Sequence, residues 1–169
     1  MSRQNWSEEC EAALNEQIRT EYRASLQYHV LAAYFYRDDI GLMKLGDFYN
    51  KRSKEEREHA DELMRYQTLR GGVVKLITLP VEELTLLKEK CILQSFRIAL
   101  EQERTVNQKL LELHAVVSKN NDPQFSDYIE GTFLKEQVED ISFLSKSIST
   151  LEMYGHDFHG AWHFVESLV

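Results

Sequence analysis

The sequence predicts an all-α fold: a four-helix bundle with a long crossover between its second and third helices and a short fifth helix at the C-terminus. Glycine and proline are scarce, with seven and two residues among 169, too few for the turns of an all-β fold. The segments between these breakers run for roughly 29 to 33 residues, which at 1.5 Å per residue makes each helix about 45 to 50 Å long. Helices of that length usually lie side by side. We expect residues 1–169 to form a single domain.

Residues that typically begin and end helices bound the first two segments. Ser7 is suited to an N-cap, and the two glutamates that follow it favour a helix N-terminus. We expect a first helix from there to residue 36 and, after a turn at 37–41, a second helix over 42–70. Gly71 and Gly72 are a strong signal for its C-terminal end.

A long connection separates the second and third helices. Residues 73–86 are largely apolar, several are β-branched, and Pro80 interrupts them. This stretch is long enough to cross the length of the bundle, so we expect the second and third helices to be parallel. The third helix is expected over 87–119. The first and third connections are short, which makes the helices that they join antiparallel.

The last part of the chain begins with a turn and a cap. Residues 120–123, Asn-Asn-Asp-Pro, supply a turn, an N-cap and a proline suited to the first position of a helix. We expect a fourth helix to run from there to Tyr154 and to end at Gly155. Residues 160–169 are expected to form the short final helix.

Charge and apolar runs exclude two classes of partner. Twenty basic residues against 28 acidic ones leave a formal net charge of -8. Nucleic acids and anionic membranes instead bind proteins through clusters of Lys and Arg. The longest apolar run, near residues 30–35, is too short to span a membrane, and the N-terminus lacks the apolar core of a signal peptide. We expect a cytoplasmic protein without a nucleic-acid or membrane partner. Cys10 and Cys91 are interpreted as incidental buried thiols.

Polar residues interrupt the inward-facing stripe of every long helix near its middle. Followed at alternating spacings of three and four, the stripes are apolar or aromatic toward their ends but contain Glu21, Glu56, Glu103 and Gln137. Glu56 and His59 are three residues apart, so both point at one place. Burying several carboxylates together is unfavourable because their charges repel one another, and bound cations offset this repulsion. Oxygen ligands with one imidazole suit iron or manganese. Taken singly, each glutamate is more simply a solvated residue; their common depth favours a metal site.

Several stretches resemble animal ferritins. The most specific is Glu-Glu-Arg-Glu-His-Ala at residues 55–60, followed by Arg-Gly-Gly at 70–72. Matches run in order from Arg3 to Gly155 and cover all four helices. The further matching stretches are residues 106–108, 110–114, 121–123 and 134–138.

The resemblance implies a ferroxidase site of the heavy-chain type, where two iron ions are oxidised by dioxygen. Glu21, Glu56 and His59 look like ligands of the first iron, with Glu56 bridging to the second. Glu103 is similar to the carboxylate ligand of the second iron. Light-chain ferritins lose several of these ligands, whereas this chain keeps all of them.

The fourth helix differs from that of other di-iron bundles, which carry a Glu-x-x-His on two helices. Here it offers Gln137, which matches a residue that holds water or dioxygen near the second iron, and Asp140, a weaker candidate ligand. This set favours turnover of iron as a substrate over its permanent binding. The resemblance also implies that Tyr28 is a phenol beside the site.

Two further sets of residues follow from the resemblance. The first would line the three-fold channel through which Fe(II) enters a 24-subunit shell: His114, Asp127 and Glu130. The second would face the cavity and nucleate the ferric mineral: Glu55, Glu58 and Asp61. A packing histidine and a solvated helix face are the simpler alternatives for these two sets.

The C-terminal residues 156–169 depart from the family. His159 and His163 are four apart, so they either project into the four-fold channel or are ordinary exposed histidines.

The resemblance implies an iron-storing homo-oligomer of 24 subunits, alone or co-assembled with another ferritin subunit, that oxidises Fe(II) and deposits ferric oxyhydroxide. Two alternatives remain open. One is a ferritin-derived structural assembly that no longer forms mineral, which the atypical C-terminus suggests. The other is a different di-iron oxidase of the bacterioferritin or rubrerythrin kind, against which the missing second Glu-x-x-His counts.

Overall fold

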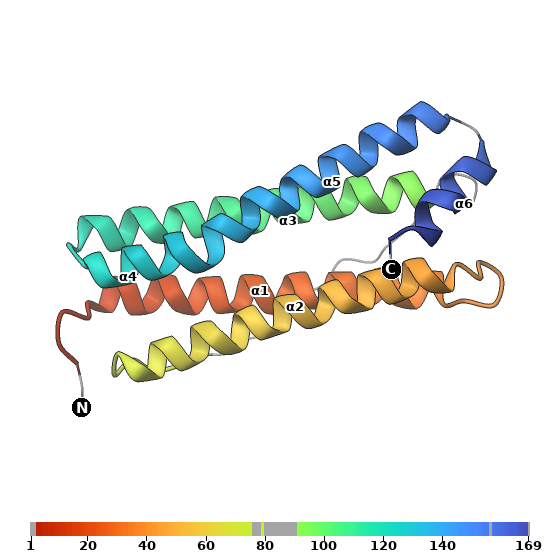
Figure 1. Cartoon of the computed structure of the whole chain (residues 1–169). Coiled ribbons are helices and arrows are strands. Elements are labelled where there is room, and N and C mark those ends of the chain that lie inside the picture. Colours follow the sequence, from red (N-terminus) through yellow and green to blue (C-terminus); the bar gives the residue numbers. More distant parts are fainter. Residues whose placement is uncertain (1–2, 76–78, 80–90, 156, 169) are drawn as a thin grey trace.

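The structure is a computed structural model that describes residues 3–75, 79, 91–155 and 157–168. These residues form the predicted helical bundle, and none of them lies in a β-strand (Figure 1). The helical segments in chain order are α1 (Glu8–Phe35), α2 (Met43–Leu69), α3 (Cys91–Lys119), α4 (Pro123–Tyr128), the π-helix η2 (Ile129–Leu134), α5 (Lys135–Tyr154) and α6 (Phe158–Glu166).

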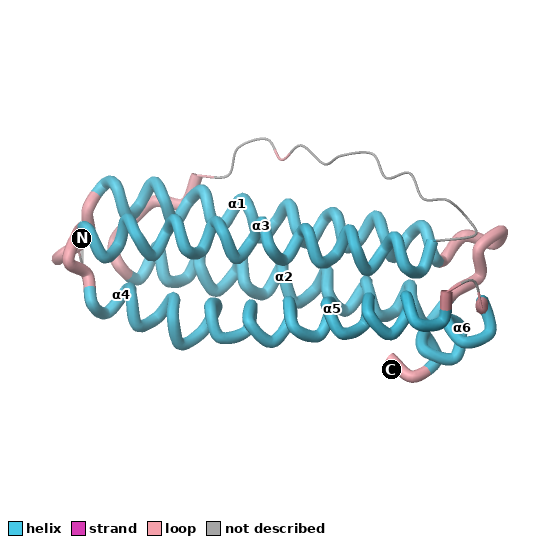
Figure 2. The backbone as a smooth tube through the Cα atoms, turned by 90° about the horizontal axis from the view of Figure 1, so that it is seen from above, coloured by secondary structure: helices cyan, strands magenta, loops and turns pink. Residues whose placement is uncertain are grey.

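The long helices run in the predicted directions. Helices α4, η2 and α5 follow one another without a break and together form the fourth rod of the bundle (Figure 1). Helices α1 and α2 are antiparallel, as are α3 and the fourth rod, while α2 ends and α3 begins at opposite ends of the bundle. Most of the expected crossover at 73–86 and the expected start of the third helix at residue 87 lie outside the described residues. Viewed from above, α6 lies at the end of the bundle away from the N-terminus (Figure 2).

The predicted caps are present. Ser7 Oγ accepts a hydrogen bond from the backbone N–H of Cys10 at 3.0 Å, which begins α1. At the end of α2, Gly71 has φ 80°, and the N–H of Gly72 donates to the carbonyl of Gln67 at 2.9 Å. This is the pattern of a Schellman motif, in which a residue without a side chain takes the left-handed conformation.

The last two helices also follow from their caps, with one difference from the prediction. Asp122 Oδ1 accepts from the N–H of Phe125 at 3.1 Å, with Pro123 at the first helical position. The final helix begins at Phe158 rather than at residue 160, because the side chain of Asp157 accepts a hydrogen bond from the N–H of His159 and caps it there.

The core has an apolar cluster toward each end and a polar band between them. One cluster includes Phe35 and Phe96, and the other includes Leu14 and Phe125. Each long rod has at least one buried polar residue at the depth between the two clusters. The polar band comprises Glu21, Ser25, Ser53, Glu56, Gln102, Glu103 and Gln137.

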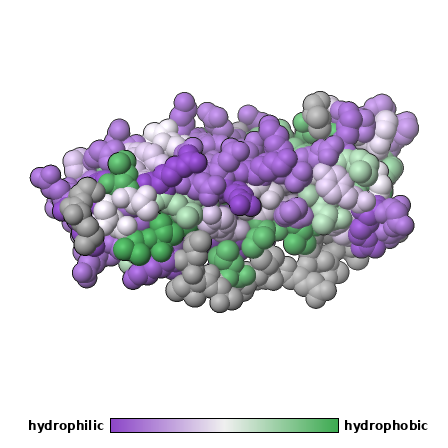
Figure 3. Space-filling model, turned by 90° about the horizontal axis from the view of Figure 1, so that it is seen from below, coloured by the Kyte–Doolittle hydropathy of each residue, from purple (hydrophilic) through white to green (hydrophobic). Residues whose placement is uncertain are grey.

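The face of the molecule that is seen from below is mostly hydrophilic (Figure 3). Seen from below, hydrophobic side chains gather in a few patches on this face (Figure 3). Among the described residues, no helix combines the length and the apolar character required to cross a bilayer.

Candidate metal centre

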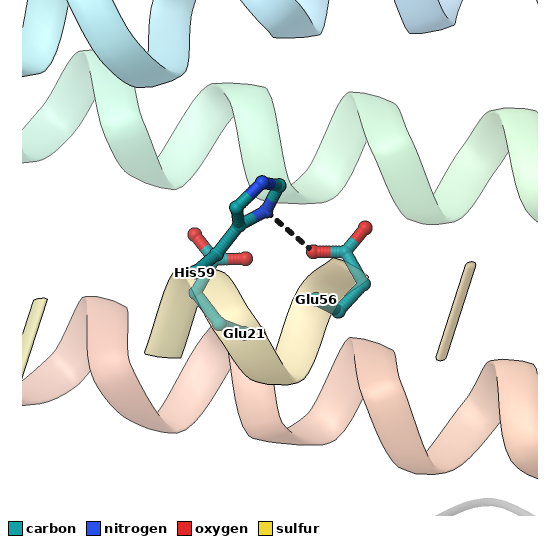
Figure 4. Close-up of side chains that lie close together, drawn as sticks. All are labelled: Glu21, Glu56 and His59. Carbon is teal, nitrogen blue, oxygen red and sulfur yellow. Dashed lines mark hydrogen bonds and ion pairs between the residues drawn. The ribbon is translucent and has the colours of Figure 1, made fainter. Parts of the chain in front are cut away.

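Three predicted ligands from two helices converge in the polar band. Glu21 belongs to α1, and Glu56 and His59 belong to α2 (Figure 4). One potential ligand atom from each lies within 4.8 Å of the other two. The two glutamate residues are 0% and 3% exposed, so a cation among them would be shielded from bulk water. Side chains three residues apart share one side of a helix, which is why Glu56 and His59 reach the same point.

Glu103 on α3 and Gln137 on α5 form a second group at the same depth. Gln137 Nε2 donates a hydrogen bond to Glu103 Oε2 at 3.0 Å. The hydroxyl of Tyr28, on α1, donates to the other carboxylate oxygen of Glu103. All three side chains are buried. The four rods of the bundle therefore each contribute at least one predicted site residue to the polar band.

Electrostatic repulsion couples the two groups. Burial raises the pKa of Glu21 well above its ordinary value, and the charge of Glu56 raises it further. Burial also raises the pKa of Glu56, and the charge of Glu103 is the next cause. The pKa of the Tyr28 hydroxyl is raised by burial and by Glu103, so Tyr28 keeps its proton and remains a donor. A bound cation would relieve this repulsion.

Unpaired oxygens at the centre fit a metal site. Glu21 Oε2, Gln137 Oε1 and Gln17 Oε1 are buried and have no hydrogen-bond partner among the described residues. Buried polar atoms without partners are rare in folded proteins, because leaving them unpaired is costly. Carboxylate oxygens, an amide oxygen and a single imidazole suit iron or manganese better than zinc. The donor set is therefore suited to binding iron.

Sequence reasoning misses two neighbours of the centre. Gln17 Nε2 donates to Glu21 Oε1 at 2.7 Å, and Glu136 Oε2 lies 3.3 Å from His59 Nε2. The other ring nitrogen, Nδ1, lies 3.4 Å from Glu56 Oε2. Gln17 precedes Glu21 by four residues, a spacing that brings side chains together and could have revealed it. For Glu136, the sequence holds no such signal.

Asp140 is not a member of the converging group. Its Oδ1 accepts a hydrogen bond from Arg52 Nη1 on α2 at 2.5 Å. Arg52 lies on the inward stripe of α2, where a cation requires a counter-ion. The ion pair therefore gives a physical reason why Asp140 does not join the cluster of Glu21, Glu56 and His59.

Two of the three predicted channel residues contact each other. His114 Nε2 and Glu130 Oε1 are 2.6 Å apart, which joins α3 to η2. Asp127 is exposed on α4. The three residues thus lie on the outside of the bundle, and the contact of His114 is with a carboxylate rather than with the apolar core.

The three predicted nucleation residues lie along α2 at spacings of three. Glu58 is exposed, while Glu55 and Asp61 are partly exposed. Glu55 Oε1 lies 3.5 Å from Lys51 Nζ, and Asp61 Oδ1 accepts a hydrogen bond from the Tyr22 hydroxyl at 3.0 Å.

The C-terminal histidines form a pair on α6. The rings of His159 and His163 have centroids 5.2 Å apart, and both side chains are exposed. Their rings also contact Trp162.

The sequence is similar to proteins named as plant ferritins. It is 48% identical to ferritin-4, chloroplastic, of Arabidopsis thaliana and 46% identical to ferritin-3, chloroplastic, of Glycine max. It is 45% identical to ferritin, chloroplastic, of Malus baccata var. xiaojinensis. Each alignment covers 100% of this chain, which spans 66%, 66% and 68% of the length of these relatives.

These relatives correct two expectations. Their names place them in chloroplasts, which contradicts the expected cytoplasmic location. They are plant proteins, so they do not support the expected likeness to the animal heavy chain. The family itself is confirmed: residues 11–154 match the ferritin-like domain of the Ferritin family. The chain belongs to the ferritin family.

Proposed function

We propose that this chain stores iron and that it is a ferroxidase, an enzyme that oxidises Fe(II) to Fe(III) with dioxygen. The observation that carries the proposal is the buried group of Glu21, Glu56 and His59 beside the pair of Glu103 and Gln137. Within this proposal, residues 1–169 act as one ferritin-like domain, and iron is the substrate of the two-iron site.

Each side chain of the site has a distinct part in binding the substrate. Glu21 and His59 bind the first Fe(II), Glu56 bridges both ions, and Glu103 binds the second. The anionic oxygens offset the positive charge that increases as Fe(II) becomes Fe(III). Gln17 fixes one oxygen of Glu21 through its hydrogen bond, which leaves the other oxygen free for iron.

Oxidation at such a site requires that two electrons reach dioxygen together. Each Fe(II) gives up one electron, so two neighbouring ions supply two. Tyr28 keeps its proton and orients Glu103. Gln137 is a neutral amide, so the ferric product is held by one carboxylate fewer than a glutamate there would supply. The product can then leave the site for storage.

The proposal extends to the assembled protein. We place His114, Asp127 and Glu130 along the channel by which Fe(II) enters, and we place mineral nucleation at the carboxylates of α2. The exposure of these residues supports that role, because dissolved iron can reach them. The membership in the ferritin family supports a homo-oligomeric shell of 24 subunits. The names of the plant relatives support a plastid location, which fractionation of organelles and immunodetection of the protein would test.

Stopped-flow absorbance tests the oxidation step. Apo-protein is mixed in air with increasing Fe(II), and the fast rise should saturate near about two Fe(II) per subunit, as a two-metal site requires. Glu56→Ala with His59→Ala should abolish the fast rise while the assembly keeps its size. The matched control is Glu62→Ala, an exposed glutamate of the same helix, which should retain the wild-type rate. A wild-type rate equal to that of iron in buffer alone would refute the proposal.

A further inference from the structure

An ion pair joins α2 and α5, two of the helices that contribute residues to the metal centre. Arg52 Nη1 on α2 lies 2.5 Å from Asp140 Oδ1 on α5, and each of the two side chains is only 15% exposed. The guanidinium lies 5.7 Å from the ring centroids of both Phe48 and Phe143. Glu55 Oε2 is 3.7 Å from the same Nη1. Arg52 is therefore held by contacts on several sides, and its position sets that of Asp140.

Both partners of the pair are one turn away from residues of the centre. Arg52 precedes Glu56 by four residues, and Asp140 follows Gln137 by three, so each lies on the same side of its helix as the site residue. The charge of Asp140 also acts on the site: it is among the groups that raise the pKa of Glu56, after burial and Glu103. Because Asp140 shares a side of its helix with Gln137, a different side-chain conformation of Asp140 would direct its carboxylate toward the metal centre.

Solvent has access to the outer side of the pair. Arg52 and Asp140 line a surface pocket of about 650 Å³ together with Glu136, Glu55 and Phe143. Glu136 in turn contacts His59 of the centre. The ion pair thus lies between an acidic, solvated pocket and the buried ligands, where a freed carboxylate could meet iron.

We propose that Arg52 is a positioning residue that holds Asp140 out of the metal centre. The fourth rod then supplies the neutral amide of Gln137 to the centre, without the negative charge of Asp140. This inference rests on the proposed function. With Arg52 in place, the negative charge of Asp140 is already compensated. Without it, a largely buried carboxylate is left unpaired, and the cations of the neighbouring site are the partners that can neutralise it. An added anionic oxygen strengthens binding of Fe(III) more than binding of Fe(II), because the attraction grows with the charge of the ion.

The test compares Arg52→Gln, Arg52→Lys and the double variant Arg52→Gln with Asp140→Asn. Arg97→Gln is the control, because Arg97 on α3 also makes an ion pair with α5, at 2.7 Å to Glu152, but at an exposed position. Assembly size and thermal unfolding establish first that each variant is folded. Binding of Zn²⁺, a probe that is not oxidised, is followed by calorimetric titration, and the heat of the Glu56→Ala, His59→Ala variant is subtracted.

Arg52→Gln should bind Zn²⁺ at the centre more tightly by on the order of tenfold, the usual size of effects from groups around metal ligands. It should oxidise a first dose of Fe(II) as fast as wild type but a second dose more slowly, because product stays bound. Arg52→Lys keeps the positive charge and should therefore have the Zn²⁺ affinity and second-dose rate of wild type. The double variant should also match wild type in both, because it lacks the carboxylate that Arg52→Gln sets free.

Equal Zn²⁺ affinity and equal second-dose rates in wild type and Arg52→Gln would overturn the inference. If Arg52→Gln does not assemble, the double variant decides: wild-type affinity supports the inference, and tenfold weaker binding shows that Asp140 is already a ligand and overturns it. If the proposed function itself is wrong, wild type will not oxidise even the first dose of Fe(II), which distinguishes that outcome from failure of this inference alone.

Discussion

Gln137 turns one end of its amide toward Glu103 and leaves the other end unpaired. Its Nε2 donates to Glu103 Oε2 at 3.0 Å, while its buried Oε1 has no partner among the described residues. The amide thus orients a carboxylate of the proposed second iron and presents a neutral oxygen at the same time. This arrangement binds the substrate without adding a further negative charge.

Replacement of that amide by a carboxylate should trap the product. In Gln137→Glu, the added charge strengthens binding of Fe(III) more than of Fe(II), so oxidation of a first dose persists and later doses slow by on the order of tenfold. The measurement is ferric iron retained per subunit after desalting, together with the rate of a second dose. Retention equal to that of wild type would show that the neutral amide is not what releases the product.

Removal of the Tyr28 hydroxyl should slow oxidation and weaken the fold slightly. Tyr28→Phe deletes the hydrogen bond to Glu103, which leaves that carboxylate less well oriented. The loss should cost about 1 to 3 kcal/mol of unfolding free energy, because a buried acceptor loses its donor. Initial rates and urea unfolding check both effects, with Tyr154→Phe, a partly exposed tyrosine near the end of α5, as the control. An unchanged rate would exclude an orienting role for Tyr28.

Repulsion among the buried carboxylates should destabilise the metal-free protein. Glu21→Gln with Glu56→Gln removes two charges whose burial is unfavourable. A gain of about 1 kcal/mol corresponds to a rise in Tm of roughly 2 to 4 °C for a chain of this size. Added Zn²⁺ should raise the Tm of wild type but not that of the variant. A lower Tm for the metal-free variant would contradict the electrostatic account of the site.

Alkaline pH should weaken the end of the bundle around Tyr66. Burial raises the pKa values of Tyr66 and Tyr128 from 10.0 to about 12, and their rings stack 4.3 Å apart. Above pH 10 the unfolded chain loses these protons before the folded one does, so stability is full below that pH and falls between pH 10 and 12. Tyr66→Phe should reduce this fall, as measured by urea unfolding across the range. An equally steep fall in the variant would assign the effect to other groups.

Local sequence signals predict the helix ends well. Ser7, the glycine pair after α2, and Asp122 with Pro123 act within a few residues of their own positions, and the structure shows them as predicted. The polar band is also predictable, because burial on a long helix follows its periodicity. The helix ends and the polar band can be predicted without knowing how the helices are rotated relative to one another.

The π-helix η2 is not predicted, although the burial pattern contains a signal for it. Phe125, Ile129, Phe133 and Gln137 are all buried at spacings of four. In an α-helix, each step of four advances about 40° past a full turn, so three steps would rotate the stripe by about 120° away from the core. The wider turn of a π-helix removes that drift and keeps Gln137 directed at the centre.

Contacts between helices are the part that the sequence alone does not predict. Arg52 and Asp140 lie 88 residues apart, and their pairing depends on how α2 and α5 are rotated and shifted. The role of Gln17 was hidden for another reason, because glutamine on a helix is usually a solvated residue. Its spacing of four from Glu21 allows a contact, and the packed bundle shows that its amide donates to Glu21.

Anomalous X-ray diffraction at the iron edge, from crystals soaked anaerobically in Fe(II), tests the central claim most directly. The account predicts one peak among Glu21, Glu56 and His59 and a second between Glu56 and Glu103, with Asp140 still paired to Arg52. The second peak should be lost in Glu103→Ala while the first remains. Iron bound only at exposed carboxylates of α2 or near His114, with neither peak in the polar band, would contradict the account.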